Sequence, residues 1–252
     1  MKLSTEKMFF GIFCIAFGVI VSVESLRADS GRTLLPDWFI PLREAVYEQR
    51  LSSAGILPVY REAVARAEDS LEGADRYIML SRCEYMMGRV YQYEERKAEA
   101  AVRYEAGMDW AEKALELIGR TEAWQMLAEN LSQACAVKSV SYAMANGLKV
   151  EKYAKEALAL DSQNAAAQIM LAARWVYAPA PFNNFKRGIA MMEDVVNNPR
   201  WNVQRDDRFN ACSAIGYAYV QQKKYVEAKS WLEAALAVYP TNKYVRTLLE
   251  KQ

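Results

Sequence analysis

Residues 210–240 read NACSAIGYAYVQQKKYVEAKSWLEAALAVYP, and this stretch decides the fold. It predicts two short helices, because small and apolar residues recur at three- and four-residue steps on either side of a polar turn at 221–224. Gly216 in the first helix and Ala228 in the second lie where packed helices must touch. Pro240 ends the second helix, since proline lacks an amide hydrogen and clashes with the preceding turn.

The stretch resembles the tetratricopeptide repeat (TPR), a helical hairpin of ~34 residues with Trp, Leu-Gly, Tyr, Ala, Phe, Ala and Pro at fixed offsets. These offsets are occupied here by Cys212, Ile215, Gly216, Tyr219, Ala228, Leu232, Ala235 and Pro240. The resemblance implies an all-α fold in which helical hairpins stack into a right-handed superhelix. It says little about function, because a repeat scaffold presents many different surfaces.

The same pattern returns, lengthened, in three units upstream. The first has Gly88 and Tyr91 at the Gly and Tyr offsets, and the second begins at Thr121 with its second helix at 153–162. The third is marked by Leu171, Ala172 and Trp175 in its first helix and by Gly188, Met192 and Val195 in its second. Such arrays need three or more units, because one unit cannot bury its own apolar face. We therefore expect about four irregular repeats and a C-terminal helix in residues 81–252.

Residues 29–80 are predicted to be helical but carry no repeat pattern. One helix is expected through about Leu51, and Pro58 is expected to open a second helix that ends at Gly73. Because a terminal repeat must hide its open face, these helices are interpreted as a cap for the array.

The first 28 residues predict export. Lys2 and Lys7 precede an uninterrupted apolar run, which is shorter than the ~20 residues that span a bilayer. The small residues Ser25 and Ala28 follow it, as in a secretory signal peptide. The pattern places the protein in the periplasm or outside the cell, and an uncleaved membrane anchor is the alternative.

Composition excludes several classes of function. The chain has 252 residues, a formal net charge of +1 and no histidine. Near-neutral charge argues against nucleic-acid partners, which need a basic stripe. The absence of histidine removes Ser-His-Asp and Cys-His catalysis and histidine metal sites. Cys83, Cys135 and Cys212 are scattered and odd in number, so we interpret them as buried small hydrophobes. We expect no enzyme activity, no cofactor and no metal.

The concave face is the expected binding surface, because in a TPR superhelix the first helix of each unit lines that side. The resemblance implies that Tyr85, Arg89, Gln125, Glu129, Ile169, Ala173, Ser213 and Tyr217 point toward a ligand, with Tyr93, Gln133, Tyr177 and Gln221 one turn further on. Family members that grip a terminal carboxylate use several convergent cationic or amide donors. Arg89 is the one arginine among the first eight residues, so we do not expect such a clamp. The tyrosines and Ile169 suit a segment with apolar anchors or an apolar small molecule, and packing against the next helix is the alternative for each tyrosine.

The third unit carries an insertion, APAPFNNF, at residues 178–185. Pro179 and Pro181 forbid a continuous helix and favour an extended loop. Phe182 and Phe185 make it either a flap that contacts a partner or a cover for the gap between two helices.

A weaker resemblance, carried by the lengthened repeats and the export pattern, is to the periplasmic T component of TRAP-type transporters. It implies association with a solute-binding protein. Our first hypothesis is a scaffold that holds a protein partner, and the second is a carrier that closes around an apolar small molecule. A sealed cavity lined by Met86, Ile169, Met170 and Tyr177 would favour the second hypothesis, and an open groove the first. An enzyme would need two buried acids facing one pocket.

Overall fold

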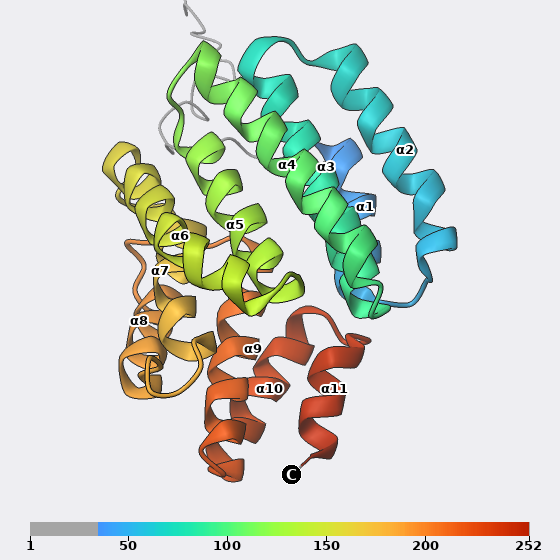
Figure 1. Ribbon diagram of the computed structural model, residues 1–252. Coiled ribbons are helices and arrows are strands. Elements are labelled where there is room, and N and C mark those ends of the chain that lie inside the picture. The colour runs from blue at the N-terminus through green and yellow to red at the C-terminus, as the bar shows by residue number, and fades with distance from the viewer. Residues whose placement is uncertain (1–34, 252) are drawn as a thin grey trace, which may run out of the picture. The chain divides into compact units, whose positions relative to one another are not determined.

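The computed structural model describes residues 35–251, and the export pattern at residues 1–28 lies outside them. The described residues form a short 3-10 helix and eleven α-helices (Figure 1). In chain order these are η1 (Asp37–Phe39), α1 (Ile40–Glu48), α2 (Ser53–Ser70), α3 (Gly73–Tyr93), α4 (Lys97–Leu117), α5 (Thr121–Val137), α6 (Val140–Leu160), α7 (Ala165–Tyr177), α8 (Phe185–Asn197), α9 (Arg205–Gln221), α10 (Tyr225–Val238) and α11 (Lys243–Glu250). Within residues 35–251, no helix is both long enough and apolar enough to cross a bilayer.

Consecutive helices pack as hairpins. The four pairs are α3 with α4, α5 with α6, α7 with α8, and α9 with α10, while α1 and α2 precede them and α11 follows. The first helices of successive pairs also contact one another, α3 with α5, α5 with α7, and α7 with α9. The predicted all-α array of helical hairpins with additional N-terminal helices is confirmed.

Small residues lie at the helix crossings, as the sequence predicts. A Cβ atom added to Gly216 would lie 2.5 Å from Cδ2 of Leu232 on the paired helix, and Ala228 is fully buried. In the α3–α4 pair, a Cβ atom at Gly88 would lie 2.5 Å from Cε1 of Tyr104. Each close approach requires a hydrogen in place of a methyl group, so these glycines fix how near the helices come.

Three helices begin earlier than the sequence pattern predicts. Pro58 does not open α2, because the helix begins at Ser53, whose amide donates to Oε1 of Glu94 at 2.6 Å. This bond satisfies an amide of the first turn, which has no partner inside the helix. Gly73 begins α3 instead of ending α2, with a φ of 54° that glycine adopts readily. The helix α6 begins at Val140 instead of near residue 153. The sequence pattern does not predict this earlier start, because Val140, Met144 and Leu148 face solvent and give no core-facing pattern.

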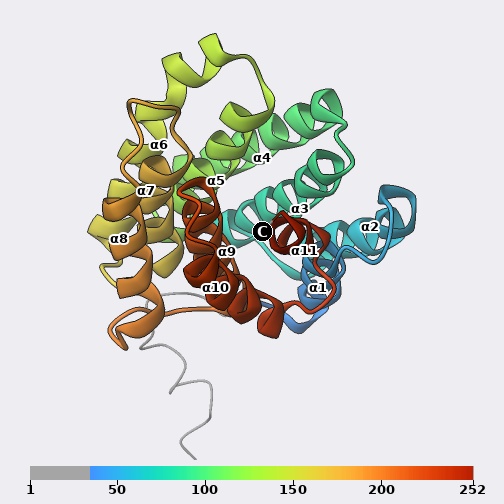
Figure 2. The same ribbon diagram turned by 90° about the horizontal axis from the view of Figure 1, so that it is seen from below.

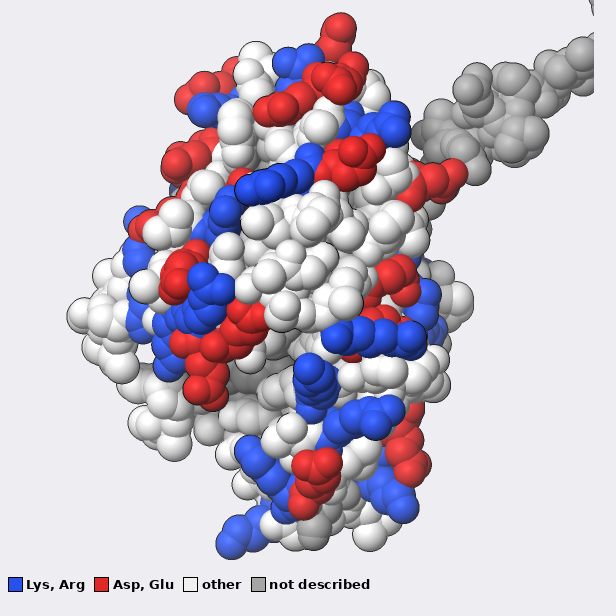
Figure 3. Space-filling model, turned by 90° about the vertical axis from the view of Figure 1, so that its right-hand side faces the viewer, with Lys and Arg blue, Asp and Glu red and all other residues white. Residues whose placement is uncertain are grey.

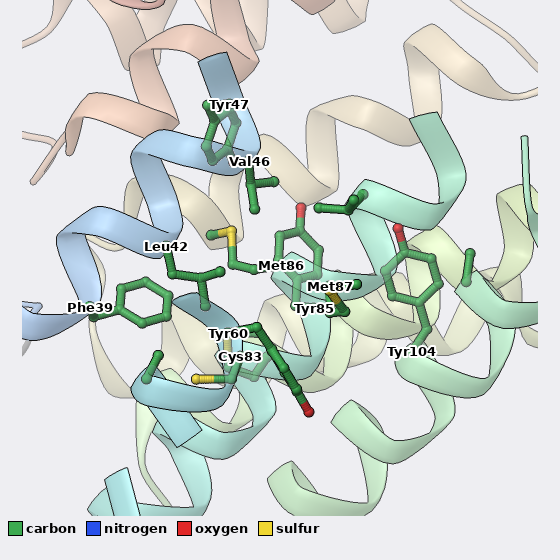
Figure 4. Packing of buried hydrophobic residues seen from close by; sticks show 14 of the residues in the cluster. Phe39, Leu42, Val46, Tyr47, Tyr60, Cys83, Tyr85, Met86, Met87 and Tyr104 are labelled. Carbon is green, nitrogen blue, oxygen red and sulfur yellow. The ribbon is translucent and has the colours of Figure 1, made fainter. Parts of the chain in front are cut away.

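The first helices of the chain pack on α3 through a dense apolar core. Phe39, Leu42 and Val46 of η1 and α1 are buried together with Cys83 and Met86 of α3 (Figure 4). Cys83 is a free, fully buried thiol, in agreement with its predicted role as a small hydrophobe.

The two ends of the array contact each other, which the resemblance to an open superhelix does not predict. Figure 2 shows the start of α11 near α1, and hydrogen bonds join it to the C-terminal end of α1. The segment that begins α11 donates several hydrogen bonds to the end of α1, among them Thr241 N to Glu48 Oε2 at 3.1 Å, Asn242 Nδ2 to Tyr47 O at 2.7 Å, and Lys243 N to Gln49 Oε1 at 2.8 Å. These bonds link residues more than 190 positions apart in the sequence, so the helices form a closed ring.

Aromatic side chains fill the contact between the ends. The Tyr47 ring of α1 stacks on the ring of Tyr239, which follows α10, at a centroid distance of 4.8 Å. Phe209 of α9 meets both rings edge-on, at 5.3 Å from Tyr47 and 5.2 Å from Tyr239. All three side chains are almost completely buried, so the closure includes an apolar core as well as polar bonds.

Candidate functional site

The ring of helices surrounds a cavity of about 930 Å³. Its wall is built mainly from α3, α5, α7 and α9, the first helices of the four hairpins, and from the end of α1 and the C-terminal α11. Binding sites for drug-sized ligands occupy about 300–1,000 Å³, so the cavity has room for a ligand of that size or a short peptide segment.

Some of the predicted binding residues lie on this wall. Those that do are Tyr85, Arg89, Ile169, Ala173, Tyr177 and Ser213, together with Tyr93 and Gln133 from the following turns. Tyr217 lies beside the wall, with its ring centroid 5.2 Å from that of Tyr177. Tyr177 is half exposed, and it contributes to the cavity wall. Of the four residues expected around a sealed cavity, Met86 is instead buried in the packing of α3.

Other predicted residues lie away from the cavity wall. Gln125 donates from Nε2 to Oε1 of Glu129 at 2.7 Å, and its own Oε1 accepts a bond from Asn164 Nδ2 at 3.2 Å. These buried side chains therefore help to join α5 to the start of α7. Phe182 is 70 % exposed in the loop before α8, and it neither lines the cavity nor folds back over the gap between the helices.

Arg89 is the central charged group of the wall. Its Nη1 donates to the hydroxyl of Tyr85 at 2.9 Å, and its Nη2 donates to the hydroxyl of Tyr93. The guanidinium carbon lies 5.4, 5.7 and 5.1 Å from the ring centroids of Tyr47, Tyr85 and Tyr93. Within residues 35–251, no carboxylate forms an ion pair with Arg89, and ring contacts of this kind supply only about 0.5–2 kcal/mol each.

The surrounding phenols are protonated at neutral pH, since the ordinary pKa of tyrosine is about 10, and their environment raises that pKa further. Burial raises the pKa of Tyr85 far above the ordinary value, and the nearby Arg89 only partly offsets this increase. The pKa values of Tyr177 and Tyr244, whose side chains face the same cavity, are also raised, because the surrounding protein takes the place of part of their water. These hydroxyls are therefore neutral hydrogen-bond donors at physiological pH.

Sequence reasoning missed the part of the wall that comes from Asn210 and from the two ends of the described array. Gln49 follows α1, Asn210 lies in α9, and Lys243 and Tyr244 lie in α11; all four line the cavity. The repeat offsets give no signal for α11, because its position depends on contacts with α1 that are remote in sequence.

Charge on the surface is mixed. On the face shown in Figure 3, basic and acidic side chains are interspersed, and neither sign forms a continuous patch. In the part of the chain that the structure describes, no group of three or more cysteine, aspartate or glutamate side chains is placed to hold a metal ion.

Comparison with known proteins gives a structural likeness but no sequence match. No protein-family model and no curated protein matches the chain. Among solved structures, the chain is similar to YrrB, described as a TPR protein with an unusual peptide-binding site. The match has 15 % sequence identity and a TM-score of 0.40, and it covers 85 % of this chain and 91 % of that one. The observed fold and cavity define an all-α array of helical hairpins whose ends meet around a central cavity.

Proposed function

We propose that the chain is a non-catalytic binding scaffold that receives a segment of a partner protein in its central cavity. The observation that carries this proposal is the cavity of about 930 Å³, whose wall comes from the first helix of every hairpin. An array of this kind places side chains from distant repeats around one ligand, as an interaction scaffold requires.

The polar part of the wall suits a peptide backbone. Ser132 and Gln133 of α5 line the cavity and are half-buried, and their side chains form no hydrogen bond with other described groups. Asn210 and Ser213 of α9 add an amide and a hydroxyl, which already donate to the Tyr47 hydroxyl and to the Asn210 backbone oxygen, each at 3.1 Å, so their side-chain oxygens are left to accept from a ligand. Amide and hydroxyl side chains pair with both the N–H and C=O groups of a peptide. A wholly apolar ligand would remove water from these groups without replacing its hydrogen bonds, at a cost of about 1–3 kcal/mol for each group.

A second candidate is a carrier of a small solute, and the closure of the ring favours it. Contacts between α1 and α11 join the ends of the array, so the cavity is bordered by helices around its circumference. Ile169, Met170 and Tyr177 provide an apolar section of wall that would accommodate the apolar part of such a solute.

The location and the partner are a further part of the proposal. The signal-like sequence at residues 1–28 supports a role in the cell envelope, with an uncleaved anchor as the alternative. The lengthened repeats and this export pattern resemble the T component of TRAP-type transporters. We therefore propose a periplasmic solute-binding protein as the partner to test first.

Filling the cavity tests the proposal. Ala173 lines the cavity, whereas Ala159 is exposed on α6, so Ala173→Trp and Ala159→Trp form a matched pair. The full chain and both variants serve as bait in an envelope extract. We expect one partner to bind the unmodified chain and Ala159→Trp but not Ala173→Trp. Equal capture by all three, with circular dichroism showing that each is folded, contradicts binding in the cavity.

Native mass spectrometry of the same proteins tests the second candidate. A small molecule that copurifies with the unmodified chain and is absent from Ala173→Trp supports the carrier function. Such a result, together with equal protein capture by all variants, would replace the first proposal with the second.

A further inference from the structure

The cavity has more hydrogen-bond donors than acceptors around Arg89. A guanidinium carries five N–H donors, and the hydroxyls of Tyr85 and Tyr93 accept two of them. Each hydroxyl that accepts from Arg89 still has its own proton to donate. Neither phenol has an acceptor for that proton among residues 35–251, so these protons remain available to a ligand.

Two more phenols lie near this group. Tyr177 and Tyr244 line the cavity and interact electrostatically with Arg89, and their hydroxyls form no hydrogen bond with another described residue. Their raised pKa values keep both hydroxyls protonated at neutral pH. The donors thus come from α3, α7 and α11, three helices on different parts of the wall.

The carboxylates in this region interact with other groups. The negative charge of Glu129 on α5 contributes to the raised pKa of Tyr85, and Glu129 accepts a hydrogen bond from Gln125 at 2.7 Å. Glu94 at the end of α3 accepts from the amide of Ser53 at 2.6 Å and pairs with Arg96 at 3.3 Å. Neither neutralises Arg89, and a partly buried cation without an anion is costly unless a bound group supplies the missing charge.

We propose that Arg89, with the hydroxyls of Tyr85 and Tyr93, is the anion-binding subsite of the central cavity and that it binds a carboxylate of the ligand. The inference rests on the proposed function and specifies the chemistry of what the cavity binds. A carboxylate offers two oxygens with about four lone-pair positions, enough for the guanidinium and both phenols. Charge-assisted bonds of this type are about twice as strong as neutral ones.

This assignment revises the expectation that the concave face carries no clamp for a terminal carboxylate. That expectation counted lysine, arginine and asparagine at the concave positions and found Arg89 alone. In the structure, the additional donors are tyrosine hydroxyls, which a count of cationic and amide residues omits. Ile169 and Met170 on α7 add apolar wall to the same cavity, so the ligand is a carboxylate attached to an apolar group.

Sodium benzoate is the first probe, with benzamide as its uncharged counterpart. We expect calorimetric titration of the full chain to show saturable binding of benzoate and much weaker binding of benzamide. Arg89→Met should weaken benzoate binding by about tenfold or more, which corresponds to 1.4 kcal/mol or more. The matched control is Arg103→Met, because Arg103 already pairs with Glu84 at 3.1 Å. This substitution should leave benzoate binding unchanged.

Two further variants separate recognition from folding. Tyr93→Phe keeps the ring and removes one donor, so it should weaken benzoate binding by about threefold or more while the protein remains folded. Arg89→Lys keeps the charge but loses the paired N–H donors, so its affinity should fall between those of the unmodified chain and Arg89→Met. Benzoate binding that is equal in all variants, or absent from the unmodified chain, overturns the subsite.

A pair of acetylated tripeptides ending in phenylalanine identifies the source of the carboxylate. Stronger binding of the free acid than of the C-terminal amide assigns the subsite to the end of a peptide chain, whereas stronger binding of benzoate than of either peptide assigns it to a small organic acid. If Ala173→Trp abolishes partner capture but no carboxylate binds, the anion subsite is wrong and the proposed function stands. If carboxylates bind at Arg89 but capture is insensitive to Ala173→Trp, the partner-binding proposal fails instead.

Discussion

Replacement of Asn242 by alanine should open the contact between the two ends of the array. Asn242 is fully buried, and its Nδ2 donates to the backbone oxygen of Tyr47 at 2.7 Å. Its Oδ1 accepts from the amide of Val245 at 3.1 Å, which caps the N-terminus of α11. One side chain therefore both starts the last helix and attaches it to the first.

The cost follows from these two bonds. Loss of an N-cap costs about 1 kcal/mol, and loss of the donor to the Tyr47 carbonyl at the buried contact costs about 1–3 kcal/mol. We therefore expect Asn242→Ala to lower the free energy of unfolding by about 2–4 kcal/mol. For a chain of this size, this corresponds to a fall in Tm of roughly 4–16 °C.

Urea unfolding followed by tryptophan fluorescence measures the change, and Asn184→Ala is the matched control. Asn184 caps α8 in the same way, by accepting from the amide of Arg187 at 3.0 Å, but its side chain is exposed and forms no bond to another helix. The control should cost about 1 kcal/mol. Hydrogen exchange of the α1 amides should accelerate only in Asn242→Ala. Equal destabilisation by the two variants, with no change in α1 exchange, would refute the contribution of ring closure.

Two other predictions concern packing and charge. Gly88→Ala places a methyl group 2.5 Å from the buried Tyr104 ring and should destabilise the protein by about 1–3 kcal/mol. The control, Gly147→Ala, has open space around its Cα and should stabilise the protein by about 0.5–1 kcal/mol. Similar urea midpoints for the two variants would contradict the close helix crossing at Gly88. Hydrogen bonds from Asn198 and the Trp201 indole, with pairing to Arg200, lower the pKa of Asp194, so its stabilising effect is present above the ordinary carboxyl pKa of about 3.9 and is lost as pH falls through the lower folded value. The stability difference between the unmodified chain and Asp194→Asn should therefore shrink below about pH 4, and a constant difference across that range would contradict this assignment.

The local pattern was sufficient to predict the hairpins. Gly216 and Ala228 lie at buried helix contacts, as expected from residues 210–240. This succeeds because a crossing between adjacent helices depends on side chains close together in the sequence. The start of α3 was missed, since Gly73 fits a helix end equally well and only its φ of 54° shows that it begins one.

The cavity was only partly predictable. Arg89 and Tyr177 line its wall, and the repeat offsets assign both residues to the concave face of the first helices. Gln125 also occupies a concave repeat offset, but its side chain is buried and hydrogen-bonded to Glu129 and Asn164. It does not reach the cavity, since α5 is packed between two neighbouring helices. The closure through Asn242 could not be deduced, because no local periodicity encodes a bond between residues 195 positions apart.

The unmet hydrogen-bond donors around Arg89 are the basis of the proposed carboxylate subsite, and a crystal structure of the full chain grown with sodium benzoate tests them most directly. We predict a benzoate in the central cavity with its carboxylate oxygens within hydrogen-bond distance of the Arg89 guanidinium and of the Tyr85 or Tyr93 hydroxyl. A cavity without benzoate at saturating concentration, or an Arg89 side chain paired with a carboxylate of the protein itself, would contradict it.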